Sequence, residues 1–104
     1  MSPLLKRQQE FTRLLVQLFT FIHGNGYEFT LGDAYRSPDS PYGLPNSLHK
    51  LRLALDINLF KGDKYLQSTE AHRIVGEYWE SIGGSWGGRF NDGNHYSLEY
   101  RGVR

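Results

Sequence analysis

The sequence predicts an α+β fold in which a small antiparallel sheet packs with two main helices. Two stretches place apolar residues at helical spacing, whereas three others show apolar residues with a period of two. The expected order of elements is helix, strand, strand, helix, strand, which favours a small antiparallel sheet. The chain has 104 residues, so we expect a single domain over residues 1–104.

The first helix is predicted over residues 3–23. Pro3 suits the first helical turn, and Gly24 and Gly26 suit the end of the helix. Its apolar residues recur at spacings of three, four and seven: Leu4, Phe11, Leu14, Leu15, Leu18, Phe19 and Ile22. We expect this helix to pack on the sheet and to carry no chemistry.

A strand is predicted over residues 27–36, followed by a loop over residues 37–46 that is rich in proline and other turn-forming residues. Long loops in compact domains are usually functional or disordered. Residues 48–60 are ambiguous because they show both strand alternation and a helical stripe, and their last four residues favour a strand. A turn is predicted over residues 62–64.

The second helix is predicted over residues 69–82, with Ser68 as its N-cap and Glu70 in its first turn. Two consecutive glycines at 83 and 84 are expected to end it. Its expected apolar face consists of Ile74, Val75, Tyr78, Trp79 and Ile82. A glycine-rich loop is predicted over residues 85–94 and a closing strand over residues 95–101.

The composition limits the kinds of site that the chain can build. It has no cysteine, which excludes disulfides and thiolate metal sites, so any metal would be bound by imidazole and carboxylate groups. The formal net charge of +1 gives no support for a nucleic-acid or membrane-surface partner. No apolar stretch approaches the roughly 20 residues of a spanning helix, and the N-terminus lacks the layout of a signal peptide.

Two short segments contain the residue types that a zinc hydrolase requires, which are three protein ligands and a carboxylate near the reacting water. The first segment contains His49 and Asp56, and the second contains Asp92 and His95. Asp56 is the most informative, because it lies in an apolar run where a buried carboxylate needs a cation, a metal or several donors. A salt bridge with one of the arginines at positions 36 and 89 would also meet that need.

Together, these segments resemble the zinc D-alanyl-D-alanine carboxypeptidase and L-alanyl-D-glutamate endopeptidase family, which includes many small phage endolysins. The family pattern Ser-x-His-x-x-Gly-x-Ala-x-Asp is matched by Ser47, His49, Ala54 and Asp56. The later Trp-Gly-Gly block and its Asp-x-x-His are matched by Trp86-Gly87-Gly88, Phe90, Asp92 and His95, and a Tyr-Arg-Ser segment by Tyr35-Arg36-Ser37. The resemblance covers roughly residues 27–100 and implies a Hedgehog/DD-peptidase-like fold with a metal-site core at roughly 27–101.

The resemblance also implies a role for each matched residue. The zinc ligands would be His49, Asp56 and His95. Asp92 would be the general acid/base that activates a water, and Arg36 would pair with a substrate carboxylate or with the developing oxyanion. Ser47 would orient a ligand or contact the substrate, and Trp86 would shape, support and line the substrate site.

The chain departs from the family pattern at two positions near these residues. Arg52 stands where the family has glycine, and Gly93-Asn94 precedes His95 where a proline is common. His49 and Asp56 are seven residues apart, so on one unbroken strand their side chains would face opposite ways. The chain must therefore bend between them, and we expect an ordinary negative-φ turn at Arg52.

The sequence and its resemblance thus predict a zinc-dependent hydrolase of peptidoglycan stem peptides, with the bond between L-alanine and D-glutamate as the favoured target. D-alanyl-D-alanine carboxypeptidase activity is the alternative, and an inactive zinc-binding virion or wall-binding module is an alternative of another class. A small metal-dependent nuclease fits less well, because it would require a basic groove. We expect a monomer that is made in a host cytoplasm and reaches the wall after release or from a virion.

Two further histidines are expected to lie outside the site. His23 stands near the end of the first helix, where a cation is mildly favoured, and we expect a structural role for it. His72 stands in the first turn of the second helix, and we expect it to be solvated.

Overall fold

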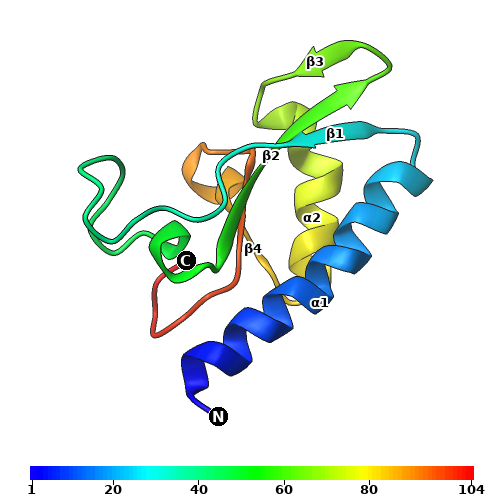
Figure 1. The fold of residues 1–104 in the computed structure, drawn as a ribbon. Helices are drawn as coiled ribbons and strands as arrows, with labels where there is room; N and C mark the ends of the chain where they lie inside the picture. The colour runs from blue at the N-terminus through cyan, green and yellow to red at the C-terminus, as the bar shows by residue number, and fades with distance from the viewer.

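The computed structural model describes residues 1–104, and Figure 1 shows two helices packed on a small sheet. The helices and strands are α1 (Pro3–Gly24), β1 (Glu28–Leu31), β2 (Ala54–Lys61), β3 (Lys64–Leu66), α2 (Arg73–Ser81), β4 (Ser85–Trp86) and β5 (His95–Ser97). Three short 3-10 helices lie between them: η1 (Leu48–Leu51), η2 (Glu70–His72) and η3 (Gly87–Phe90).

All strand pairs in the sheet are antiparallel. The strand order is β1-β2-β5-β4, and β3 pairs with β2 on the edge opposite β1. The predicted α+β fold class, with a small antiparallel sheet and two main helices, is confirmed. Strand β2 is the centre of this arrangement, since it pairs with β1 and β3 at one end and with β5 at the other.

Helix α1 confirms the predicted helix over residues 3–23. The Ser2 hydroxyl oxygen accepts a hydrogen bond from the backbone N–H of Leu5 at 3.0 Å, which satisfies one free donor of the first turn. Its buried face packs on α2, where the rings of Phe11 and Trp79 meet edge to face with centroids 5.9 Å apart. Burial of such aromatic pairs supplies much of the stability of a small core.

The strands are shorter than the sequence predicts. The strand predicted over residues 27–36 pairs only as far as Leu31, although backbone hydrogen bonds of 2.8 Å join Gly32 and Asp33 to Asp56 before the chain turns away. The strand predicted over residues 95–101 ends at Ser97. Two strands were not predicted, namely β3 after the confirmed turn at residues 62–64, and β4 within the expected loop.

The second helix was also predicted too long. Helix α2 begins at Arg73, and the turn before it is the 3-10 helix η2, where the Ser68 hydroxyl accepts from the N–H of Ala71 at 3.0 Å. The prediction that Ile74 lies on the buried face is wrong, because this side chain is 55% exposed. Val75 and Trp79 are buried as predicted, and Gly76 lies on the buried face with them.

His72 is buried rather than solvated. The residue is 1% exposed, and its Nδ1 lies 2.8 Å from the hydroxyl oxygen of Tyr96. Burial lowers the pKa of His72 and outweighs the opposing hydrogen bond to the backbone of Leu66. Sequence reasoning failed here because a polar residue at a helix start gives no sign that a strand from the far end of the chain covers it.

His72 is expected to make the fold less stable in mild acid. Its pKa in the folded state lies below the ordinary value of 6.5, so the unfolded chain binds a proton more readily. The stability that neutral His72 contributes is therefore fully present at pH values above 6.5, and it is lost as the pH falls through the pKa of the folded state. We expect His72→Gln to lose less of its unfolding free energy than the wild type between neutral pH and pH ~5, as urea titrations would measure. Equal losses in both proteins would contradict this.

Neither helix has the length and apolar character that crossing a membrane requires.

Candidate metal centre

The register of the sheet places Asp56 directly beside His95. Strands β2 and β5 pair antiparallel with Asp56 opposite His95, Leu55 opposite Tyr96 and Ala54 opposite Ser97. Residues that lie opposite one another in an antiparallel pair project their side chains to the same face. The pairing alone therefore brings together two residues that are distant in the sequence.

His49 reaches the same place because the segment predicted ambiguously over residues 48–60 divides into two elements. The first part is the 3-10 helix η1, which Ser47 caps by accepting from the N–H of His49 at 3.3 Å. The second part is strand β2, which starts at Ala54. The two residues therefore do not lie on one strand, so their odd spacing is no obstacle.

The turn between η1 and β2 is at Arg52, which has φ 57° and ψ 37°. The expectation of an ordinary negative-φ turn is wrong, and the left-handed conformation explains why the family has glycine at this position. The guanidinium carbon of Arg52 lies 3.9 Å from the centroid of the Tyr35 ring. That cation–π contact offsets part of the conformational cost.

Arg52→Val is expected to destabilise the fold by about 1–3 kcal/mol, because a β-branched side chain opposes the left-handed conformation. Arg52→Gly loses the contact with Tyr35 but accepts the turn, so we expect it to remain close to the wild type. Denaturant midpoints of the two variants would test this. A valine variant as stable as the glycine variant would show that the turn does not constrain this residue.

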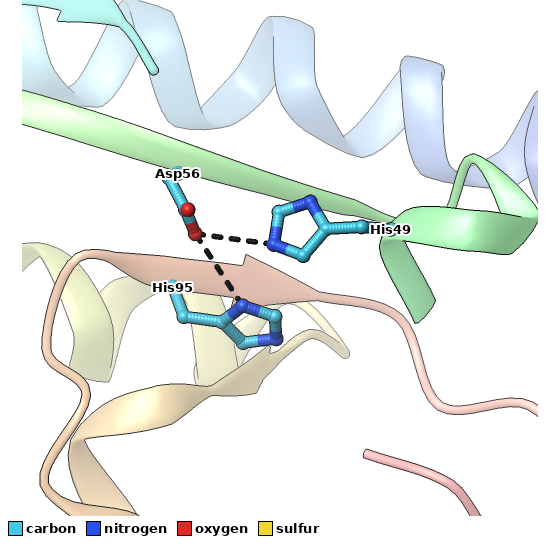
Figure 2. A group of neighbouring side chains, drawn as sticks. All are labelled: His49, Asp56 and His95. Carbon is cyan, nitrogen blue, oxygen red and sulfur yellow. Dashed lines mark ion pairs between the residues drawn. The ribbon is translucent and has the colours of Figure 1, made fainter. Parts of the chain in front are cut away.

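Three side chains converge where these elements meet, as Figure 2 shows. Nε2 of His49 lies 3.3 Å from Oδ1 of Asp56, and Nδ1 of His95 lies 3.4 Å from the same oxygen. One donor atom from each of the three residues lies within 4.8 Å of the other two. His49 and His95 are buried, and Asp56 is half-buried.

The tautomer of His49 is determined by the backbone. Nδ1 of His49 lies 2.8 Å from the carbonyl oxygen of Ala34, which can only accept, so Nδ1 carries the proton. In the neutral ring, Nε2 then has a lone pair that faces the carboxylate of Asp56. Two lone pairs at 3.3 Å repel one another unless a proton or a cation lies between them. The site is therefore built for a positive species.

The pKa shifts have the same origin. Burial raises the pKa of Asp56, but hydrogen bonds and charge attraction from His49 and His95 outweigh it and lower that pKa to about 2. Burial lowers the pKa of His49, whereas the Asp56 carboxylate and the Ala34 carbonyl raise it. Together the two raising effects are the larger, so the pKa of His49 lies above its ordinary value. A proton and a metal ion would thus compete for Nε2 of His49.

The spacing of the donor atoms fits a zinc ion. Donors at about 2.0–2.2 Å from a tetrahedral zinc ion lie about 3.3–3.6 Å from one another. Oδ1 of Asp56 lies 3.3 and 3.4 Å from the two imidazole nitrogens, and all three donor atoms lie within 4.8 Å of one another. Two imidazoles and one carboxylate are a ligand set of catalytic zinc sites and leave a fourth position for water or substrate. The hydrogen bond from His49 to Ala34 is the outer contact that orients such a ligand.

These three residues line a cavity of about 280 Å³. The structure brings other predicted site residues to its wall: Asp92, Arg36 and Ser47. The remaining lining residues were not singled out as site residues from the sequence: Gly43, Leu44, Asn46, Phe90, Val103 and Arg104. Among them, only Phe90 had a sequence signal, because it matches the second motif block, whereas Val103 and Arg104 come from a segment with no motif.

Arginine does not neutralise Asp56. Arg36 lies 3.5 Å from Asp33 and donates to the Ser47 hydroxyl at 3.4 Å, while Arg89 pairs with Glu80 at 2.6 Å. The salt bridge considered for Asp56 from the sequence is thus absent. Arg36 instead presents its guanidinium to the cavity, where a planar fork of donors can bind a carboxylate or a carbonyl oxygen that gains charge.

A tight turn places Asp92 beside His95. The N–H of His95 donates to the carbonyl of Asp92 at 3.1 Å, and the N–H of Asp92 donates to the carbonyl of Gly87 at 2.9 Å. A Cβ at Gly87 would lie 2.3 Å from that Asp92 carbonyl and 2.7 Å from Cβ of His95, so only glycine permits this approach. The first glycine of the Trp-Gly-Gly motif is therefore needed for the close packing of this segment against Asp92 and His95.

Trp86 supports this turn from behind. Its side chain is 2% exposed and its indole N–H donates to the carbonyl of Gly93 at 2.7 Å, so it does not line the cavity. These contacts agree with the supporting role expected for Trp86, whereas a direct contact with substrate stays a prediction. His23 lies away from the centre, exposed, with Nδ1 3.7 Å from Glu28.

Comparison with known proteins adds an independent finding. A family model described as D-alanyl-D-alanine carboxypeptidase matches residues 43–98, which is more than half of the chain and includes His49, Asp56, Asp92 and His95. The comparison with curated proteins gave no match. The match, together with a His-Asp-His group that could hold a metal, shows that the chain belongs to the D-alanyl-D-alanine carboxypeptidase family of zinc peptidases that act on peptidoglycan.

Proposed function

We propose that this protein is an endolysin-like zinc endopeptidase that cleaves peptidoglycan stem peptides between L-alanine and D-glutamate. The observation that carries the proposal is the lone pair of His49 Nε2, which faces the Asp56 carboxylate at 3.3 Å beside His95, in a cavity that also contains Asp92 and Arg36. In this proposal His49, Asp56 and His95 bind zinc, and Asp92 and Arg36 act on the water and the substrate beside it.

The proposed roles follow from where the side chains lie. A zinc ion, when bound, would acidify a water and polarise the peptide carbonyl. The Asp92 carboxylate would take a proton from that water and deliver it to the leaving amine. Arg36 would attract the negative charge that develops on the carbonyl oxygen, and Ser47 would keep Arg36 in place through the contact described above.

D-alanyl-D-alanine carboxypeptidase activity is the second candidate, because the matching family model is described by that reaction. The two reactions differ in the length of substrate that lies beyond the cut bond on its C-terminal side. A carboxypeptidase holds the terminal carboxylate within one residue of the metal, whereas an endopeptidase needs room for several residues. The metal cavity shares three wall residues with a second and larger cavity, which favours the endopeptidase.

Digestion of purified peptidoglycan would test the proposal. We expect the zinc-loaded protein to release stem peptides with a new D-glutamyl N-terminus, as read by mass spectrometry, and a chelator to abolish this release. Release of terminal D-alanine alone would support the second candidate. Intact peptidoglycan after treatment with the zinc-loaded protein would reject both. Action on the wall after release from an infected cell, or from a virion, is part of the same proposal.

A further inference from the structure

A second cavity of about 500 Å³ adjoins the metal cavity. The two share Asn46, Ser47 and Val103, so they form one continuous surface around the loop before η1. We name it the side groove, and its other lining residues are Leu4, Pro45, Lys50, Leu51, Tyr100 and Arg101. In Figure 1 the C-terminus lies beside η1, above the start of α1, in agreement with this lining.

Hydrogen bonds hold the three walls of the side groove in place. The side chain of Gln8 donates to the carbonyl of Leu51 at 2.8 Å, which ties α1 to η1. The guanidinium of Arg7 donates to the carbonyl of Glu99 at 2.7 Å, which ties α1 to the C-terminal segment. That segment closes on itself through two hydrogen bonds of 3.0 Å between Tyr100 and Val103. A ligand would therefore meet a preformed surface.

The charges of the side groove have one sign. Lys50 and Arg101 line it and no acidic residue does. Arg101 has no carboxylate within salt-bridge distance, and Lys50 contacts only the carbonyl of Ser40, at 3.2 Å. Leu4 and Leu51 add apolar surface to the same groove. Such a surface suits a chain that is partly aliphatic and ends in a carboxylate.

The backbone at Arg101 adds a second observation. Its φ of 50° is unfavourable for a residue with a side chain, and the guanidinium carbon lies 5.1 Å from the Tyr100 ring centroid. The chain has two other non-glycine residues with positive φ, Arg52 and Asn91, and both lie in the turns that position the metal-binding side chains and Asp92. Arg101 thus stands in an unfavourable turn at the wall of the side groove.

We propose that the side groove is a substrate subsite that binds the arm of the stem peptide beyond the cut bond and recognises its free C-terminal carboxylate through Arg101 and Lys50. This inference rests on the proposed function, since it assumes that the metal cavity cuts a stem peptide. The arm on the other side of the bond leads to the sugar, and it offers no free carboxylate to these cations.

Two synthetic stem peptides of the same sequence, one ending in a carboxylate and the other in a carboxamide, would test the proposal. We expect the zinc-loaded wild type to cleave the carboxylate peptide with a kcat/KM about tenfold higher than that of the carboxamide peptide, mainly through a lower KM. A difference of about tenfold is what the loss of one charge-assisted hydrogen bond would cause. Arg101→Asn tolerates the positive φ, and Lys50→Gln retains a donor for Ser40. Each should reduce the preference, and the double variant should abolish it.

Lys64→Gln is the matched control, because Lys64 is an exposed cation on β3 and lines neither cavity. This variant should keep the full preference. Two results would overturn the proposed role of the side groove and leave the proposed function standing. One is an unchanged preference for the carboxylate peptide in both Arg101→Asn and Lys50→Gln, and the other is equal cleavage of the two peptides by the wild type. Failure of the wild type to cleave either peptide would instead reject the proposed function.

Discussion

Asp92→Asn is expected to lower kcat on stem peptides by about 10²–10⁴-fold, which is the usual contribution of a positioned general acid/base. Asparagine keeps the size of the side chain but cannot take a proton from water. Since Asp92 is exposed and its backbone hydrogen bonds survive the change, the thermal midpoint and the metal content should remain those of the wild type. Steady-state kinetics with metal analysis on the same preparation would measure all three quantities.

Asp63→Asn provides the control for Asp92→Asn. Asp63 lies in the turn between β2 and β3, is exposed, and does not line the metal cavity. Its loss should leave kcat unchanged. If Asp92→Asn kept full turnover, the role proposed for Asp92 would be wrong, and a loss of metal in this variant would mean that Asp92 acts on the metal rather than on the water.

His49→Ala is expected to lower zinc affinity by more than the roughly 100-fold that loss of an outer-shell partner can cost. The variant loses one of three ligands and leaves a half-buried carboxylate with only His95 beside it. Competition with a chromophoric chelator would measure the affinity, and stem-peptide cleavage should fall with metal occupancy. His95→Ala should behave in the same way, which tests the cluster without relying on one variant.

His23→Ala is the matched control for the loss of a histidine, because His23 is exposed at the end of α1 and its polar contacts are with Glu28 and the Tyr27 carbonyl, away from the metal centre. Its zinc affinity should equal that of the wild type. Normal zinc content in both His49→Ala and His95→Ala would exclude the proposed ligand set and would require a metal site elsewhere or none.

The sequence predicted the elements whose cause is local. Helix α1 follows from apolar spacing, Pro3 and a serine cap, and each of these acts within one helical turn. Strand β3 was missed because its three residues pair with β2 and have little pattern of their own. The burial of His72 was missed for a related reason, since Tyr96 covers it from a strand 24 residues later in the chain.

The candidate site was predictable in its side chains but not in its backbone. His49, Asp56, Asp92 and His95 were singled out from two spaced motifs, and the structure places them around one cavity. The left-handed turn at Arg52 was missed because arginine rarely adopts this conformation, although the glycine that the family has at this position pointed to it. The carbonyl of Ala34 was equally invisible, since a main-chain acceptor exists at every position.

That main-chain contact affects how the protein can tolerate change. Because the acceptor for His49 is a carbonyl and not a side chain, no amino-acid exchange at position 34 can delete it. We therefore expect the amino acid at position 34 to vary among relatives, although its carbonyl keeps the same role. Insertions or deletions between Leu31 and Arg36 would instead shift the carbonyl, so we expect natural length variation to fall outside this stretch and mainly within residues 37–46.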